Sequence, residues 1–210
     1  MKKVLYVIGF FVVCGIIGAI TGGDNKNVNQ PTQKIEQTQN KTPVQQSTPQ
    51  KVATLHINPT TFQQNYNQIM ATEMGEMGAS GMFNMPTPQI QKGNGQDVVQ
   101  YTFEDGVIFM ELIDPNTNEI KEIMITAMLP SGNTDAMRAN LMAALMLYVA
   151  SLRATNLNLT SNDVQAIQNE LGLNQSVDKW INATSTSRGN VTYSKQIVPK
   201  VGMVFSISAK

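Results

Sequence analysis

From residue 56 onward, the spacing of apolar and polar residues predicts a helix, three strands, two helices and two more strands. The first helix is expected to begin after Asn58, because Asn is a good N-cap and Pro59 suits the first helical position. One face of this helix is apolar, and its members recur at helical spacing: Phe62, Tyr66, Ile69, Met70 and Met74.

A three-strand meander is predicted next, with strands at residues 98–104, 107–113 and 120–129. Asp105 and Gly106 form a strong two-residue hairpin signal between the first two strands. The second segment is apolar on both faces except for Glu111, which predicts a central strand with neighbours on both sides.

Two helices and a hairpin complete the pattern. A long apolar helix is expected over residues 134–154, and a shorter one follows Thr160, where Asp163 completes a capping box. The polar stretch around residues 187–189 is expected to be a surface loop anchored by Trp180, and residues 190–197 and 201–208 read as two strands. The order α-βββ-αα-ββ predicts an α+β fold, in which an antiparallel sheet (a three-strand meander plus a C-terminal hairpin) packs on two or three helices.

The amino terminus has the pattern of an export signal. Lys2 and Lys3 precede an uncharged run, Val4 to Ile20, and the stretch of residues 4–23 is long enough to cross a bilayer as a helix. The positive-inside bias places everything after residue 23 outside the cytoplasm. We interpret residues 1–23 as an uncleaved signal anchor in the lipid bilayer, with two alternatives: a cleaved signal peptide, which would release a periplasmic or secreted protein, and a lipoprotein lipidated at Cys14.

Residues 24–55 form a segment of different composition. They are rich in Gln, Asn, Thr, Lys and Pro, contain no aromatic residue, and cannot bury enough apolar surface to fold. We expect a disordered linker here, followed by one globular domain over residues 56–210.

Charge and cysteine content exclude several classes of function. From His56 onward the chain has 9 basic and 13 acidic residues, a net charge of −4 without a basic run, so nucleic acid is not an expected partner. The chain has a single cysteine, Cys14, and a single histidine, which leaves no intramolecular disulfide and effectively no His/Cys zinc site. A Cys–His nucleophile pair is excluded from the exported part of a single chain.

Methionine offers a candidate metal site. Of the 13 methionines, five lie between Met70 and Met85, and thioethers are soft ligands that suit Cu(I) or Ag(I). The segment loosely resembles the Met-rich loops of bacterial copper-resistance proteins. In this alternative the ligands are Met74, Met77, Met82 and Met85, whereas the favoured interpretation is that these methionines fill the core.

Glu111 is the candidate for a hydrolase. A carboxylate on an otherwise apolar strand either lies at the open face of the sheet, which we favour, or is a buried acid with a raised pKa. No second catalytic group accompanies it in the sequence, so no catalytic residue and no cofactor are assigned. The favoured hypothesis is a non-catalytic, membrane-tethered protein of the bacterial envelope that binds another envelope protein or a surface component.

Overall fold

The computed structural model describes residues 52–74, 83–103, 106–130, 134–176 and 179–210. These residues belong to one compact unit that spans Lys51–Lys210. The expected signal anchor and nearly all of the expected linker lie outside the described residues, so both stay predictions.

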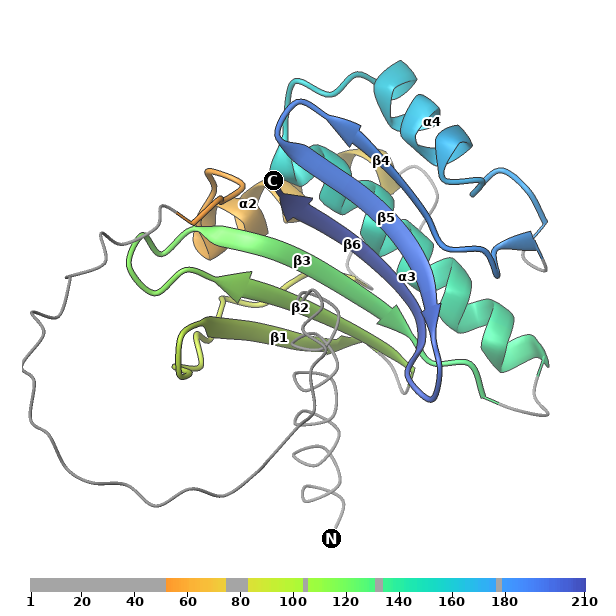
Figure 1. Cartoon of the computed structure of the whole chain (residues 1–210), viewed down its shortest axis with the longest axis horizontal. Helices are drawn as coiled ribbons and strands as arrows, with labels where there is room; N and C mark the ends of the chain where they lie inside the picture. The colour runs from red at the N-terminus through yellow and green to blue at the C-terminus, as the bar shows by residue number, and fades with distance from the viewer. Residues whose placement is uncertain (1–51, 75–82, 104–105, 131–133, 177–178) are drawn as a thin grey trace, which may run out of the picture. The chain divides into compact units, whose positions relative to one another are not determined.

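Six antiparallel strands form a single sheet, and their order across it is β1-β2-β3-β6-β5-β4 (Figure 1). Their bounds are β1 Asp97–Phe103, β2 Val107–Ile113, β3 Ile120–Ala127, β4 Thr184–Arg188, β5 Val191–Val198 and β6 Gly202–Ala209. The α+β class, the antiparallel sheet and the element order are therefore as the sequence predicts, and the meander and the C-terminal hairpin are confirmed.

Pairing of β3 with β6 joins the meander to the C-terminal hairpin. Ile123 lies opposite Ile207 and Ile125 lies opposite Phe205, and all four side chains are fully buried. Directly opposed residues point to the same face of a sheet, so the two parts contribute to one continuous apolar surface.

Helix α2, Pro59–Ile69, covers the meander side of that surface. The side chain of Asn58 accepts a hydrogen bond from the backbone N–H of Thr61, which confirms the predicted cap. The Phe62 ring stacks on Phe109 of β2 with 5.8 Å between ring centroids. The helix then changes to one π-helical turn, η1, Met70–Met74, so the regular α-helix ends one turn earlier than the sequence pattern predicts.

Helix α3, Thr134–Thr155, lies behind the sheet in the view of Figure 1 and packs on β3 and β6. Tyr148 of this helix is fully buried, with its ring 5.2 Å from that of Phe205, and its hydroxyl donates to the backbone carbonyl of Ser206. Helix α4, Ser161–Glu170, begins with the predicted capping box between Thr160 and Asp163. Within the described residues, no helix has the length and apolar character needed to cross a bilayer.

Strand β4 corrects the prediction of a surface loop around residues 187–189. Its side chains are mostly hydroxyls without an apolar alternation, so the local pattern does not indicate a strand. The strand is held because it pairs with β5 along its length, and because the guanidinium of Arg188 makes two hydrogen bonds to the Glu170 carboxylate of α4, at 2.7 and 3.1 Å. The predicted anchoring role of Trp180 is confirmed: the ring is 2% exposed and donates to the carbonyl of Gln175.

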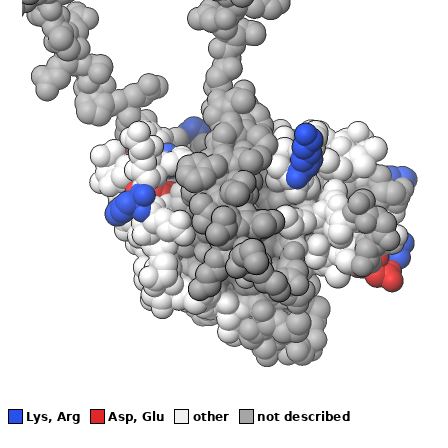
Figure 2. Space-filling model, turned by 90° about the horizontal axis from the view of Figure 1, so that it is seen from below, with Lys and Arg blue, Asp and Glu red and all other residues white. Residues whose placement is uncertain are grey.

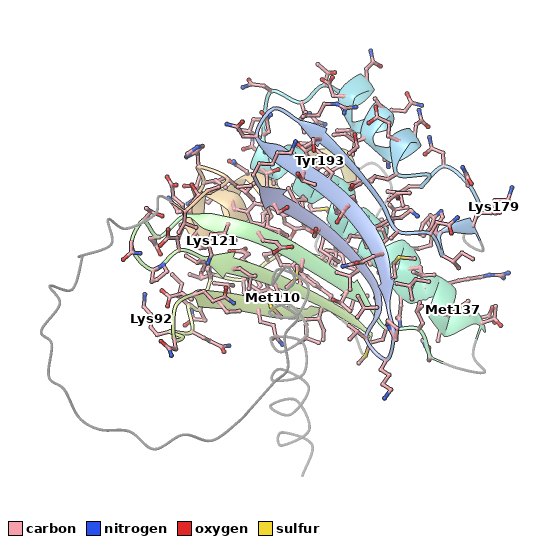
Figure 3. All side chains as sticks on the ribbon, in the orientation of Figure 1. Lys92, Met110, Lys121, Met137, Lys179 and Tyr193 are labelled. Carbon is pink, nitrogen blue, oxygen red and sulfur yellow. The ribbon has the colours of Figure 1, made fainter. Side chains whose placement is uncertain are left out.

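The two faces of the sheet differ. The helix face is packed under α2 and α3 and carries the core, whereas none of the described helices lies over the other face, which we call the outer face and which is turned to the viewer in Figure 1. Met110 of β2, labelled in Figure 3, belongs to the outer face because its neighbours Phe109 and Glu111 point to the helix face.

A close backbone approach at Gly202 fixes the hairpin between β5 and β6. Its φ is 128°, and a Cβ there would collide with the carbonyl oxygen of Ala127 on β3.

We expect Gly202→Ala to lower the free energy of unfolding by more than about 2 kcal/mol, because the substitution introduces both backbone strain and the clash with Ala127. Gly189→Ala is the matched control, with a φ of 56° and open space around it, and should cost about 1 kcal/mol. Urea unfolding of the three proteins measures this, and equal losses in both variants would contradict it.

Candidate functional site

Glu111 lies in the core on the helix face of β2, and not at an open face. Its register partners are Val99 on β1 and Ile123 on β3, and the residue is 0% exposed. The favoured sequence interpretation of an exposed carboxylate is therefore wrong, and the alternative of a buried acid is the one that the structure supports. The physical reason is the alternation of the strand, which places Glu111 on the same face as Phe109 and Ile113.

Two tyrosine hydroxyls share this part of the core. Tyr101 of β1 and Tyr66 of α2 both pack against Phe109, with centroid distances of 5.9 and 6.4 Å. Among the described residues, neither carboxylate oxygen of Glu111 has a hydrogen-bond partner, and the same holds for the Oη atoms of both tyrosines. We call Glu111, Tyr101 and Tyr66 the core polar cluster. Buried polar atoms in native proteins are nearly always paired, so this cluster is an exception that calls for a physical explanation.

Burial sets the protonation state of the cluster. The loss of hydration raises the pKa of the Glu111 carboxyl from 4.5 to about 8, with no offsetting cation. Burial also raises the pKa of the Tyr66 and Tyr101 hydroxyls above their usual range, and for Tyr101 the charge of Glu111 adds to the effect. At neutral pH all three groups are therefore uncharged, and Glu111 can act as a hydrogen-bond donor.

These three groups do not form a hydrolytic site as they stand. Glu111 is closed off from solvent, and hydrolysis by carboxylates takes a second acid or base in a cleft beside it. In the described part of the chain no group of three or more His, Cys, Asp or Glu side chains is placed to hold a metal ion.

The methionine alternative falls mostly outside the described residues. Met77 and Met82 are not described, and Met74 is described only by its place in η1. Met85 is 2% exposed and belongs to the core, together with Met70. For these two residues the structure agrees with the favoured interpretation of core packing.

Lys195 is a second buried polar group, which the sequence analysis did not single out. It lies on the helix face of β5, opposite Phe205, and is 2% exposed. Its ammonium donates to the backbone carbonyls of Asn182 at 2.8 Å and Trp180 at 3.1 Å, and burial lowers its pKa. The lysine thereby ties the segment before β4 to the sheet. An isolated Lys in a run of alternating residues was the only sequence signal.

The outer face of β4, β5 and β6 is lined by small hydroxyl and amide side chains. We call it the hydroxyl surface, and it consists of Ser185, Ser187, Thr192, Ser194, Gln196, Ser206 and Ser208. All are exposed or half-buried, and Ser194 and Ser206 are hydrogen-bonded to each other at 2.8 Å. A shallow pocket of about 260 Å³ opens here between Ala183, Ser185, Ser194 and Gln196.

Beyond the hydroxyl surface, the outer face becomes apolar toward β1. Five side chains there are 3–8% exposed and lie outside the core cluster under the helices: Val98, Met110, Leu112, Met124 and Val204. Glu122 is a charged side chain at an outward position of β3, next to Lys121 at the bulge of that strand, and burial raises its pKa although Ser206 is hydrogen-bonded to it. In the view of Figure 2, the Lys and Arg side chains of the described residues are scattered and form no continuous patch, and some of them lie beside Asp or Glu side chains.

Comparison with known proteins gives no relative for this chain. No protein-family model matches it, and neither the curated proteins nor the solved structures contain a significant match. The function is therefore argued from the residues of the chain itself.

Glu111 makes the stability of the domain depend on pH. Folding raises the pKa of the Glu111 carboxyl, so the protonated group contributes fully to the free energy of unfolding below about pH 4.5. This contribution is lost as the pH rises toward 8, at about 1.4 kcal/mol per pH unit. Glu111→Gln removes this dependence, so we expect it to be roughly 3 kcal/mol more stable than the parent at pH 7 and nearly equal to it at pH 5. Urea unfolding from pH 5 to 8 measures both. Parallel stability profiles of the two proteins would contradict the assignment.

The ammonium of Lys195 is expected to stabilise the segment around Trp180 and Asn182. Lys195→Met leaves the carbonyls of Trp180 and Asn182 without their donor, so we expect a loss of about 1–3 kcal/mol and easier quenching of Trp180 fluorescence by acrylamide. Trp180 is the only tryptophan of the chain, which makes the signal specific. Lys179→Met, at an exposed neighbouring position, is the control and should change neither quantity. Unchanged quenching in Lys195→Met would show that the ammonium does not hold this segment.

Proposed function

We propose that this chain is a membrane-tethered, non-catalytic binding protein that faces the outside of the cytoplasm and uses the hydroxyl surface to bind another envelope protein. The anchor is the apolar segment of residues 4–23, and residues 24–55 serve as the linker that lets the domain reach its partner. About 30 residues of coil have an r.m.s. reach of roughly 30 Å, which is comparable to the thickness of the hydrocarbon core.

The observation that carries the proposal is the hydroxyl surface itself. Ser, Thr and Gln side chains each offer donors and acceptors, and here they stand on three paired strands whose backbones hold them in fixed positions. Protein interfaces use about one hydrogen bond per 100–200 Å² around less polar contacts. The neighbouring apolar side chains Val98, Met110, Leu112 and Met124 are only 3–6% exposed, so a partner would make its contacts mainly with the hydroxyl surface itself.

The composition of the surface favours a protein over a nucleic acid. No outward position of the six strands is aromatic, and stacking on aromatic rings is the usual way in which single-stranded nucleic acids are bound. Nor does the surface carry Lys or Arg that would neutralise phosphates. A partner that meets an uncharged face gains little from long-range attraction, so its binding should depend only weakly on salt.

Site-specific photocrosslinking tests the proposal in cells that express the full chain. A photoreactive residue at Ser185 or Ser194 should give a discrete adduct with a membrane or envelope protein, because both side chains point outward on the hydroxyl surface. The same residue at Gln165, exposed on α4, is the matched control and should give no such adduct. We expect the adduct yield in isolated membranes to change less than about twofold between low and high salt.

Three results would count against the proposal. Equal adducts from Ser185 and Gln165 would show that the hydroxyl surface is not selective. An adduct with a polysaccharide would show that the partner is a glycan and not a protein. Recovery of the chain in the cytosolic fraction, with its amino terminus intact, would show that residues 4–23 do not anchor it in the membrane.

A further inference from the structure

The core polar cluster lies where helix α2 meets the sheet. Phe109 of β2 is the residue on which Phe62 and Tyr66 of α2 pack, and Glu111 is the next residue of β2 on the same face. The carboxyl group therefore sits beside the main aromatic contact between α2 and the meander. Any change in its charge acts directly on that contact.

Helix α2 is also held by its packing on α3 and by hydrogen bonds, one of which runs from the Gln63 amide to the carbonyl of Met85 at 2.9 Å. On the side of α3, the Asn65 amide donates to the carbonyl of Ala154 at 3.2 Å, and at the far end Asn67 exchanges two hydrogen bonds with the backbone of Met85. The helix continues into the π-helical turn η1, a geometry that is rare and frequently marks functional segments. A helix with these attachments can separate from the sheet without the six strands coming apart.

We infer that the core polar cluster is an internal proton-binding site, and that α2 stays packed on β1 and β2 only while Glu111 holds its proton. With the proton bound, the carboxyl is a neutral group among neutral hydroxyls. When the proton leaves, a carboxylate without a cation is enclosed by apolar residues. Separation of α2 from the sheet lets water reach the carboxylate and costs less free energy than keeping the charge buried.

The neighbours of Glu111 do not relieve this charge. The charge of Glu111 acts on Tyr101 of β1, and Tyr66 of α2 packs on the neighbouring Phe109. Both hydroxyls stay neutral over the range in which Glu111 titrates. From β3 the neighbours on the helix face are Ile123 and Ile125. On α3, the buried Tyr148 packs on Phe205 of β6, and the half-buried Arg153 has its Nε atom buried.

Other buried groups are separated from the cluster. Lys195 lies on β5, beyond β3 and β6, where two carbonyls occupy its ammonium. Burial alone accounts for the raised pKa of Glu111, which agrees with an acid that has no counter-ion.

The expected size of the effect follows from the two pKa values. Between about pH 5 and pH 8 the ratio of open to closed α2 rises about tenfold per pH unit, and it levels off above about pH 8. Hydrogen exchange of the full chain in detergent, with amide rates corrected for the direct effect of pH on exchange, measures this ratio as a loss of protection. The amides of α2 should lose about tenfold protection per pH unit and should stay less protected than those of β6, which exchange only when the whole domain unfolds, and Trp180 fluorescence should not change.

Variants assign the effect to the carboxyl. Glu111→Gln should make protection in α2 independent of pH, and Glu111→Leu should do the same if the amide of Gln disturbs the core. Glu122→Gln is the matched control: its carboxyl also has a raised pKa but lies on the outer face, so the pH dependence of α2 should persist. The inference is overturned if protection in α2 does not vary with pH in the parent, if it varies equally in the Glu111 variants, or if the amides of α2 are as strongly protected as those of β6 at every pH, which would mean that α2 opens only with the whole domain.

Discussion

The pairing of β3 with β6 is the interaction on which the rest of the structure depends. It makes one sheet from two parts that are separated in sequence by two helices, and it creates a helix face wide enough for α2 and α3 together. Phe205 shows the consequence: it contacts Tyr148 of α3 and Trp180, while its partner Ile125 lies beside Phe109 of the meander. Neither part alone has enough apolar neighbours to bury its half of this face.

Glu111 and Lys195 are both buried on the helix face of the sheet, and the fold treats them differently. Lys195 keeps two hydrogen bonds, since the loop between α4 and β4 turns its carbonyls inward, and the lysine thereby strengthens the attachment of that loop. Glu111 lacks a partner among the described residues, so desolvation acts on it without compensation. A lysine satisfied in this way is a structural element, whereas an unpaired acid makes the packing above it sensitive to its proton.

The outer face has the opposite character. Its outward residues on β4, β5 and β6 are mostly short hydroxyls and an amide, which need no covering layer, because water satisfies them as well as a partner does. The fold thus separates its tasks: the helix face supplies stability and the proton-sensitive contact, and the outer face supplies a neutral surface on a rigid support. This division supports a binding role and gives no reason to assign chemistry to Glu111.

The sequence by itself determined the elements whose signals are local. The cap at Asn58, the capping box at Thr160 and the three strands of the meander depend on neighbours within a few residues, and their order predicts the α+β class. Tertiary structure decided what depends on distant partners. Strand β4 has no apolar alternation and exists because β5 pairs with it and α4 binds Arg188. The side on which Glu111 lies was equally undetermined, because β2 is apolar on both faces and only the placement of α2 shows which of them is enclosed by helices.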